Sequence, residues 1–439
     1  MTTWITGPAH GNHVPVVVVG GGQAGLSVSY YLQRVGLEHV VLERQYAMHA
    51  WEDQRWDNFC LVTPNWQCQL PGYAYSKEFG GREPEGFMTK AQLRAYLAGF
   101  RQAVNAPLSE GVEVQRIRRS VLGGFDVITS AGDYHCDAVV VATSAYHAPN
   151  IPVAARHLPP HIVQLDPLRY RSPAALPPGG VMVVGSGQSG CQIAEDLHLA
   201  GRSVHLCTGR APRVNRRYRG QDVVKWLDEM GHYAMTVAQH PLKEGVRRKA
   251  NHYVTGRDGG RDIDLRVLAQ QGMQLYGRLL QVDGLTWHFA DDLAANLDAA
   301  DATCERIRRS IDDFIAKTGR QAPQEPPYVP CWRPSASACS LDLARAGIGS
   351  VIWATGYSPR FSAFVAEDVF DERGMPVHER GVTAVAGLYF VGLPWLHTWG
   401  SGRFSAIAAD AAHLVEHLRQ TLRTLSYPSP ALAAWGAAV

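Results

Sequence analysis

The sequence lacks several features that would place it in a particular class of protein. It has no run of about 18 apolar residues, so no membrane span is expected. Its net charge of +2 gives no reason to expect nucleic acid or an anionic membrane as a partner. The eight cysteines include no CxxC pair and no group has metal-ligand spacing, so neither a dithiol centre nor a metal site is indicated. Such scattered thiols suit the reducing cytoplasm, which is the predicted location.

The N-terminal residues also lack a targeting signal. Met1–Asn12 have neither the apolar core nor the basic cluster of a signal or transit peptide, and are predicted to form a frayed tail. The chain has 439 residues, of which 46% are hydrophobic, which is enough for two or three domains with ordinary cores.

The residues that follow this tail have the pattern of a dinucleotide-binding unit. A wholly β-branched run, Val16–Val19, predicts a buried parallel strand. It leads into Gly20-x-Gly22-x-x-Gly25, and 26–35 then predict a helix whose N-terminus can face a pyrophosphate. The next strand ends at Glu43, where an acid accepts hydrogen bonds from a ribose. Strand, glycines, helix, second strand and acid together are far more specific than the glycines alone.

A segment rich in tryptophan comes after this unit. Between Trp51 and Trp66, three tryptophans alternate with charges and fit neither helix nor strand periodicity. We expect this loop to pack against a flat ligand, although a loop that merely covers the sheet is the simpler alternative. Residues 89–104 then predict a helix with Thr89 as its N-cap, and 112–117, 124–128 and 138–141 predict an antiparallel meander.

A second dinucleotide unit begins at Val181. Its strand precedes Gly185-x-Gly187-x-x-Gly190, with a helix over 191–199 and a strand over 204–207. The position of the ribose-binding acid is Thr208, and Arg210 follows it. Without a carboxylate to repel it, a 2′-phosphate can bind here, which favours NADP over NAD. Of the further arginines, at least half are expected on a solvated face: Arg213, Arg216, Arg217 and Arg219.

The two units are predicted to bind different cofactors. The first keeps its acid and suits FAD, whereas the second suits NADPH, as in a flavoprotein that brings the nicotinamide over the flavin. The predicted fold is α/β with two Rossmann-like domains, the FAD domain being discontinuous. FAD is assigned to 1–150 and 345–439, and NADP to 151–344, which includes a helical insertion.

With these motifs, the chain resembles the class B flavin-dependent monooxygenases, the flavin-containing, N-hydroxylating and Baeyer–Villiger enzymes. The match includes Trp51, the segment 55–57, Leu70-Pro71, the motif Ala354-Thr355-Gly356 that joins the two domains, and the strand 388–392. Two further segments, 256–262 and 393–404, resemble a narrower bacterial subgroup whose members tend to be encoded near nitrilases.

The sequence departs from the superfamily at the monooxygenase fingerprint FxGxxxHxxx(aromatic). Tyr170 supplies its aromatic residue, but Asp166 replaces the histidine and Ile162 the glycine. Ser144 also replaces the glycine of the first ATG-like turn. These changes concern oxygen activation rather than the fold, so an NADPH oxidase or reductase that releases hydrogen peroxide is kept as the alternative. A flavin-dependent oxidoreductase of an amine or nitrile pathway is also left open.

The resemblance implies that NADPH reduces FAD and that a flavin C4a-hydroperoxide oxygenates a small nucleophilic nitrogen or sulfur substrate. The partners are then this substrate and molecular oxygen, and a homodimer is left open. We expect Asn65, Trp395, His397 and Trp399 to line the reaction cavity. The predicted cofactor-binding residues are Gly20, Gly22, Gln23, Ala24, Gly25, Glu43, Arg44, Trp51, Arg55, Trp56, Gly185, Gly187, Gln188, Ser189, Gly190, Thr208, Arg210, Thr355, Gly356, Gly392, Phe404 and Ser405.

The region 214–338 matches the superfamily least. Apolar residues near helical spacing predict a helix over 292–317, and the proline-rich 321–327 predicts a linker. His232, His240 and His252 occur singly, which favours structural roles. The last helix, over 405–422, is expected to begin near the flavin pyrimidine ring and to stabilise the reduced anion with its dipole.

Overall fold

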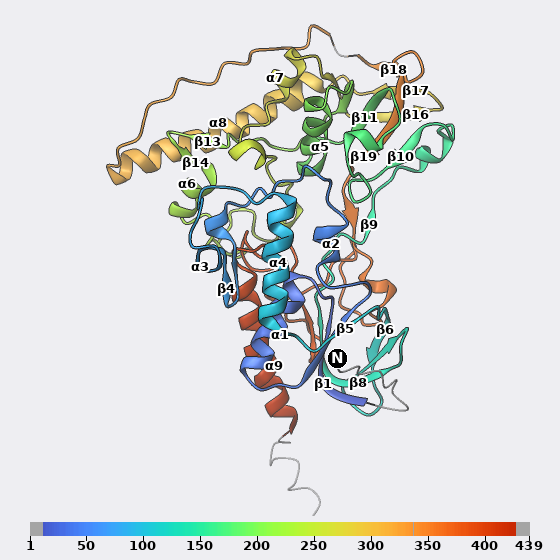
Figure 1. Ribbon diagram of the computed structural model, residues 1–439, viewed down its shortest axis with the longest axis vertical. Helices are drawn as coiled ribbons and strands as arrows, with labels where there is room; N and C mark the ends of the chain where they lie inside the picture. The colour runs from blue at the N-terminus through green and yellow to red at the C-terminus, as the bar shows by residue number, and fades with distance from the viewer. Residues whose placement is uncertain (1–11, 337, 427–439) are drawn as a thin grey trace, which may run out of the picture.

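The computed structural model describes residues 12–336 and 338–426. They form two parts stacked along the longest axis, each built on its own β-sheet (Figure 1). The predicted tail over Met1–Asn12 lies outside the described residues, except that Asn12 begins strand β1 (Asn12–Val19). No helix in the described ranges is long and apolar enough to span a membrane.

The first sheet has seven strands. Its order is β5-β2-β1-β8-β7-β6, and β21 also pairs with β8; the bounds are β5 (Leu108–Glu110), β2 (His39–Glu43), β8 (Tyr134–Val141), β7 (Phe125–Thr129), β6 (Val114–Arg119) and β21 (Leu388–Phe390). Strands β5, β2, β1, β8 and β21 are parallel, whereas β6, β7 and β8 form the predicted antiparallel meander. Val16–Val18 are fully buried, as a strand covered on both faces requires.

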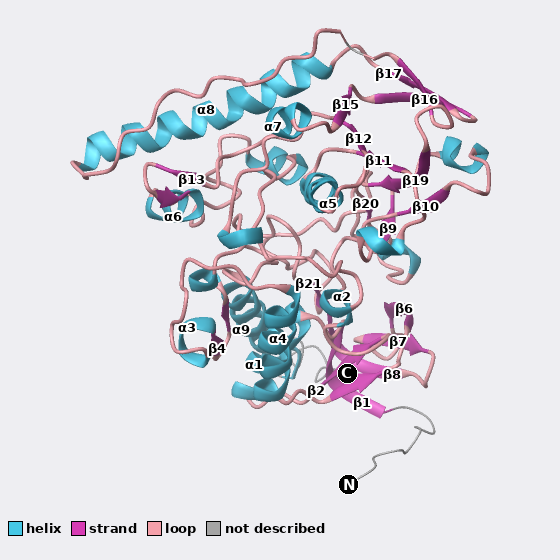
Figure 2. Ribbon diagram, turned by 45° about the horizontal axis from the view of Figure 1, so that its top comes forward, coloured by secondary structure: helices cyan, strands magenta, loops and turns pink. Residues whose placement is uncertain are grey.

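Three long helices lie together beside this sheet: α1 (Gln23–Arg34), α4 (Lys90–Val104) and α9 (Ile407–Ser426) (Figures 1 and 2). Helix α4 begins as predicted, because Thr89 and Gln92 form a capping box in which each side chain bonds the other residue's backbone N–H. The last helix begins two residues later than the expected 405. Shorter elements precede α4: α2 (His49–Glu52), β3 (Gln69–Leu70), β4 (Tyr73–Ala74) and α3 (Tyr75–Glu78).

The second sheet is wholly parallel and has the order β10-β19-β11-β12-β15. Its strands are β10 (Val163–Leu165), β19 (Ile348–Trp353), β11 (Gly180–Val184), β12 (Val204–Cys207) and β15 (Gln274–Tyr276). Helix α5 (Gln188–Leu199) follows β11 and α7 (Leu265–Gln270) precedes β15. The predicted second strand–helix–strand unit is therefore present.

The predicted domain boundary at residue 345 lies just before strand β19. This strand lies between β10 and β11, in the second sheet, so the chain returns to the first part only after Trp353. The two connections between the parts lie side by side, since β9 (Ala148–Pro149) pairs antiparallel with β20 (Tyr357–Ser358).

The insertion contains the longest helix, α8 (Leu293–Thr318), which confirms the helix predicted over 292–317. It also contains β13 (Arg217–Tyr218), β14 (Gln221–Asp222), α6 (Val223–Glu229), β16 (Leu279–Asp283) and β17 (Thr286–Phe289), and β17 pairs with β18 (Ser340–Asp342). The predicted linker, 321–327, has no helix or strand.

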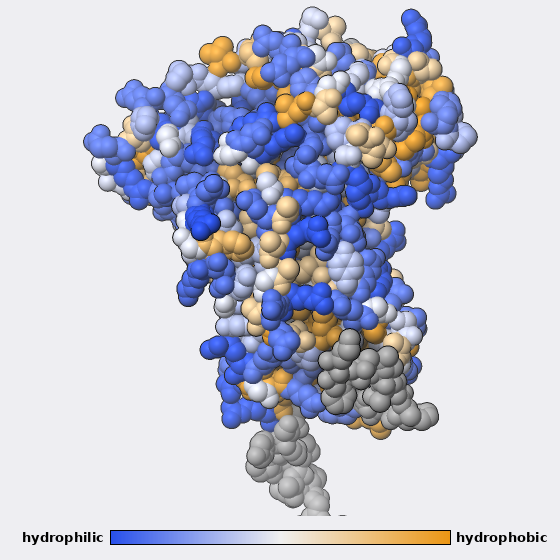
Figure 3. Space-filling model, in the orientation of Figure 1, coloured by the Kyte–Doolittle hydropathy of each residue, from blue (hydrophilic) through white to orange (hydrophobic). Residues whose placement is uncertain are grey.

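The surface in Figure 3 is mostly hydrophilic, with hydrophobic residues gathered near β16 and β17. Inside, Trp287 of β17 is fully buried and stacks on Trp353 of β19, with ring centroids 5.6 Å apart. This contact joins the small sheet of the insertion to the second parallel sheet.

Candidate functional site

The first glycine-rich loop has the geometry of a phosphate cradle. Gly20 has φ +111°, and a Cβ there would lie 2.7 Å from the carbonyl oxygen of Ala142. A Cβ on Gly25 would lie 1.9 Å from the oxygen of Gly20, so helix and strand can pack only without it. A Cβ on Gly22 would meet nothing within 4 Å. Gly22 therefore faces open space at the N-terminus of α1, where backbone N–H groups are free for a pyrophosphate.

The second loop repeats this construction. Gly185 has φ +107° and approaches Ala354, whose oxygen would lie 2.5 Å from a Cβ. A Cβ on Gly190 would lie 1.8 Å from the oxygen of Gly185, and Gly187 again faces open space at the start of α5. Each loop therefore packs on the turn that ends a neighbouring strand, Ala142 in one sheet and Ala354 in the other.

These two turns, at 142–144 and 354–356, share a left-handed residue. Gly356 has φ +89°, and Ser144 adopts φ +61° although it is not glycine. Thr355 donates a hydrogen bond to the carbonyl of Asn150, whose N–H donates to Gly356 O at 2.9 Å. Thr355 and Gly356 therefore fix the crossover between the two parts, and their contact with a cofactor stays a prediction.

Glu43 holds the first loop in place. Its buried carboxylate accepts hydrogen bonds from the N–H groups of Gly21 (2.8 Å) and Gln45 (2.9 Å). His49 Nδ1 lies 3.6 Å from the same group. Binding of a ribose by Glu43 stays a prediction. Arg44 is exposed and lies 3.8 Å from Glu113, so it contributes little to the stability of the fold.

The N-terminus of α1 is linked to the segment before α9. Gln23 accepts a hydrogen bond from the indole N–H of Trp51 (2.9 Å) and donates to the carbonyl of Gly402 (3.3 Å). The ring of Trp51 packs on Phe404, with centroids 5.2 Å apart. Ala24 also lies close to Gly392, because a Cβ added to Gly392 would be only 2.8 Å from the Cβ of Ala24. Several predicted cofactor residues are thus brought together from three distant parts of the chain.

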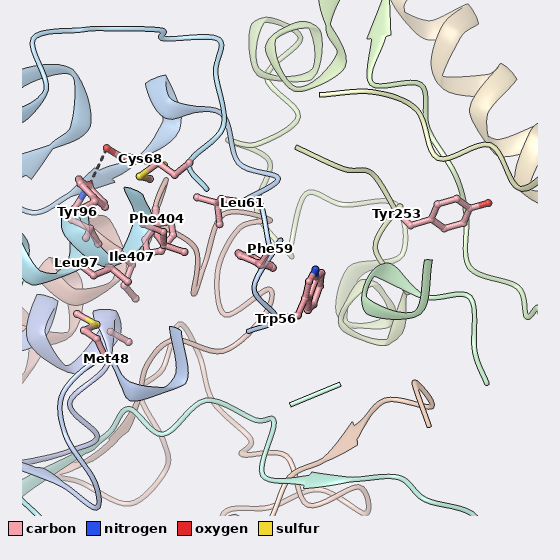
Figure 4. Close-up of a cluster of buried hydrophobic side chains, with 14 of the residues drawn as sticks. Met48, Trp56, Phe59, Leu61, Cys68, Tyr96, Leu97, Tyr253, Phe404 and Ile407 are labelled. Atoms are coloured by element: carbon pink, nitrogen blue, oxygen red, sulfur yellow. Dashed lines mark hydrogen bonds between the residues drawn. The ribbon is translucent and has the colours of Figure 1, made fainter. Parts of the chain in front are cut away.

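Figure 4 shows Phe404 and Ile407 packed beside Tyr96 and Leu97, with Phe59 and Trp56 farther along the cluster. Trp56 is only 5% exposed and contacts Phe59 and Tyr170, which is the packing of a core residue. Its binding to a cofactor stays a prediction.

Two buried oxygen atoms in this region have no hydrogen-bond partner. One is Oδ1 of Asn65, whose amide nitrogen donates to Glu83 O at 3.0 Å, and the other is the hydroxyl of Ser405. The turns that carry them are adjacent, since the N–H of Gln69 donates to Phe404 O at 3.2 Å. Buried polar atoms are nearly always bonded, so these two indicate room for a polar ligand. With the open space at Gly22, they make this region fit FAD.

The NADP side is partly different from the prediction. Thr208 is buried and donates to Tyr276 O at 2.8 Å, so its hydroxyl holds β15. The amide group of Gln188 bonds both backbone groups of Val254, which leaves only backbone N–H groups of Gln188 and the next residue, Ser189, for a phosphate. Arg210 is exposed and has no side-chain partner among the described residues. It alone of the predicted side chains here is free for a 2′-phosphate.

Two arginines of this run are buried. Arg213 is 2% exposed and pairs with Asp301 at 2.5 Å, and Arg216 is 0% exposed and pairs with Asp222 at 2.7 Å. A guanidinium can be buried when a carboxylate compensates its charge. Neither residue is available to a coenzyme, and the exposed arginines of the run are Arg210 and Arg217.

The segment 395–399 is covered by the insertion. Trp395 has φ +52° and is buried against Val237 and Val246, and its ring lies 5.4 Å from that of His240. Trp399 packs on Tyr233 with centroids 4.4 Å apart, and Val237 N–H donates to His397 O at 2.8 Å. Trp395, His397 and Trp399 are therefore together, whereas no described contact joins Asn65 to them. The covering residues were not predicted, because no motif marks them.

His397 is neutral at pH 7. Burial lowers its pKa from 6.5, and the nearby charge of Arg380 lowers it further. A neutral imidazole can both donate and accept a hydrogen bond, so His397 can move a proton near the two tryptophans.

The loop 256–262 inserts between the two parts. Gly256 approaches Leu61, whose oxygen would lie 2.1 Å from a Cβ, and Gly260 approaches Phe87 at 2.5 Å. Only glycine permits such contact, which explains the glycines of this motif. In the fingerprint region, Tyr170 donates to Asp196 at 2.7 Å, and Asp166 accepts from the N–H of Leu168 at 2.8 Å.

No group of three or more potential ligands in the described residues has the geometry of a metal site. The seven cysteines at 60, 68, 136, 191, 207, 304 and 331 form no disulfide bond. Cys191 is fully buried, and burial raises the pKa of its thiol well above the ordinary range. Nothing in this set has the arrangement of a redox dithiol.

A family model described as pyridine nucleotide-disulphide oxidoreductase matches residues 17–292, which include both glycine-rich loops. The chain belongs to this family. Members of this oxidoreductase family and the flavin monooxygenases use FAD and NADPH, which confirms the two predicted cofactors. A relative called an uncharacterized CzcO-like oxidoreductase, from Geobacillus kaustophilus, is 28% identical over 406 residues, or 92% of this chain and 98% of the relative.

Solved structures have the same fold. A flavin-containing monooxygenase from Stenotrophomonas maltophilia superposes with a TM-score of 0.63 at 20% identity, covering 94% of this chain and 99% of that one. An ornithine N-hydroxylase from Kutzneria sp. 744 gives 0.60 at 15% identity, covering 93% and 99%. These likenesses confirm the fold with two Rossmann-like domains. The family match over residues 17–292 makes the chain an oxidoreductase.

Proposed function

We propose that this protein is an FAD-dependent, NADPH-using monooxygenase that oxygenates a small nucleophilic nitrogen or sulfur substrate. The observation that carries this proposal is the pair of open glycine cradles, at Gly22 and Gly187, in a chain whose sequence has no CxxC pair. Electrons taken from a pyridine nucleotide at the second cradle then have no dithiol to reduce. Molecular oxygen and a small substrate are the acceptors that this arrangement leaves, and a homodimer stays a prediction.

FAD would be held at its pyrophosphate by the N-terminus of α1 and at its ribose by Glu43. When bound, it supplies the electron transfer from NADPH to molecular oxygen. In the overall reaction, NADPH, a proton, oxygen and substrate give NADP, water and the oxygenated substrate. Asn65 and Ser405 offer polar atoms to the flavin, and Arg210 offers a charge to the 2′-phosphate of the coenzyme.

The remaining residues of the site exclude water. Trp395 and Trp399, covered by Val237, Val246 and Tyr233 of the insertion, form an apolar wall. His397 is placed in this wall and is neutral, so it can hold or transfer a proton without adding a charge. Two indole rings favour a flat or aromatic substrate.

The test compares NADPH oxidised, oxygen consumed, peroxide released and product formed with a thioether substrate. A monooxygenase gives sulfoxide in proportion to NADPH, with little peroxide. If the amount of peroxide released equals the amount of NADPH oxidised with every nucleophile tested, the protein is an oxidase instead. That alternative is favoured by one observation, namely that Asp166 caps a turn where the fingerprint has histidine.

A further inference from the structure

One half-buried cation near this wall has no anion to balance it. Arg403 packs its guanidinium on the ring of Trp399, 3.8 Å from the centroid. No carboxylate or carbonyl oxygen of the described residues accepts a hydrogen bond from its side chain, and no described acid lies within ion-pair distance. Every other described arginine that is not exposed either lies within ion-pair distance of a carboxylate, as Arg216 does to Asp222, or donates to a backbone carbonyl, as Arg202 does to Pro173.

A second arginine lies on the same side of the site. Arg55 packs on Trp51, 4.6 Å from its centroid, and has no carboxylate partner. Trp51 contacts Phe404, the residue that follows Arg403 in the chain. The hydroxyl of Tyr146 interacts electrostatically with both, which agrees with their placement around one space.

Such a cation is costly to bury alone. Burial lowers the pKa of Arg403, because the charged guanidinium loses water and no acid replaces it. A guanidinium with its five donors available matches a carboxylate, which it binds with two parallel hydrogen bonds. The indole of Trp399 fixes the plane of this guanidinium, which reduces the entropy lost on binding.

We infer that Arg403 binds an anionic group of the substrate, so that the enzyme selects a flat, aromatic monoanion over its neutral analogue. This inference rests on the proposed function for the site, and it adds the charge of the substrate. Arg403 is a specificity-determining residue in this view. The ring of the substrate packs beside the partly exposed Trp399, and the guanidinium takes the carboxylate.

The experiment uses two aryl sulfides that differ only in charge, 4-(methylthio)benzoate and 4-(methylthio)benzamide. Equilibrium dialysis of the purified FAD-loaded enzyme measures the Kd of each, without NADPH or turnover. Wild type should bind the benzoate at least tenfold more tightly than the benzamide, the effect of one charge-assisted contact. Equal affinity for the two compounds in wild type would overturn the inference.

Three variants complete the test. Arg403→Gln should weaken benzoate binding about tenfold to a hundredfold and leave benzamide binding within about threefold. Arg403→Lys keeps the charge and should keep most of the preference. Arg116→Gln removes an exposed, unpaired arginine of β6 and should behave as wild type. If Arg403→Gln kept the preference but bound FAD or NADPH more weakly, the anion would be a cofactor phosphate and the inference would fail.

Failure of the role of Arg403 can be distinguished from failure of the proposed function. Carboxylate-dependent binding without sulfoxide formation would support the role of Arg403 and contradict the monooxygenase. Sulfoxide formed equally from both compounds would support the monooxygenase and contradict the role of Arg403.

Discussion

Arg257 donates a hydrogen bond to Asp196 at 2.7 Å and joins the inserted loop to helix α5. Asp196 is 1% exposed and also accepts from Asn58 at 2.9 Å and from Tyr170 at 2.7 Å. One carboxylate thus joins the tryptophan-rich loop, the fingerprint region, helix α5 and the insertion.

Replacing Asp196 by asparagine should destabilise the protein by about 1–3 kcal/mol, because Arg257 loses its counter-ion and one bonded group its acceptor. The change is measured as a lower midpoint of urea unfolding. Asp258→Asn is the matched control, since its side chain is 67% exposed. An equal midpoint for Asp196→Asn and the control would show that this carboxylate is not needed for stability.

The two cradles allow a paired test of cofactor assignment. Gly22→Val should abolish FAD binding, because the side chain would occupy the space of the pyrophosphate. Gly187→Val should keep FAD but lose reduction by NADPH. Neither substitution meets protein atoms within 4 Å at Cβ, and both backbones have negative φ, so the fold should tolerate them. Flavin absorbance after gel filtration and the rate of flavin reduction are the measurements. Full flavin occupancy in Gly22→Val would refute the first assignment.

Coenzyme preference should depend on Arg210. NADPH should reduce the flavin more efficiently than NADH, and Arg210→Ala should lower the preference about tenfold to a hundredfold, since a charged contact to phosphate contributes about 1.5–3 kcal/mol. Arg217→Ala is the control, because this arginine is also exposed and nearby. The measurement is the kcat/KM for NADPH divided by the kcat/KM for NADH, in wild type and in each variant. With Arg213 and Arg216 buried in ion pairs, an unchanged ratio in both variants would exclude the exposed arginines of this run.

Trp399→Ala should uncouple the reaction. FAD binding and NADPH reduction should stay nearly unchanged, whereas peroxide per NADPH should rise, because the opened wall admits water. Trp399→Phe keeps an aromatic ring on Tyr233 and should stay close to wild type. Equal peroxide ratios in all three proteins, with normal reduction, would make this segment purely structural.

Acid should destabilise the protein as the pH falls from 6.5 towards 4. Burial lowers the pKa of His205 to about 4, whereas in the unfolded chain it is about 6.5. Between these values the unfolded state binds a proton that the folded state does not, so stability is lost by up to about 1.4 kcal/mol per pH unit. His205→Gln should reduce this slope, as measured by urea unfolding at several pH values. His161→Gln, at an exposed site, should not.

Short sequence patterns determined the helices and strands of the fold. The valine run 16–19, the glycines after it and the cap at Thr89 each act within a few residues, so their strand, turn and helix follow from sequence. The repetition of the first unit at Val181 then predicted two Rossmann-like domains. The tryptophans of 395–399 were likewise recognised as one segment.

Only the tertiary structure decided which of these residues meet. The residues of β19 predict a strand but not its neighbours, and only the structure shows that it pairs with β10 and β11 in the second sheet. The sequence alone does not distinguish Arg213 and Arg216 from Arg403. Arg213 and Arg216 are buried in ion pairs with acids, whereas Arg403 has no carboxylate partner among the described residues. The difference depends on carboxylates such as Asp301, which lies 88 residues from Arg213. Burial and charge balance are set by contacts between distant segments, which no local pattern records.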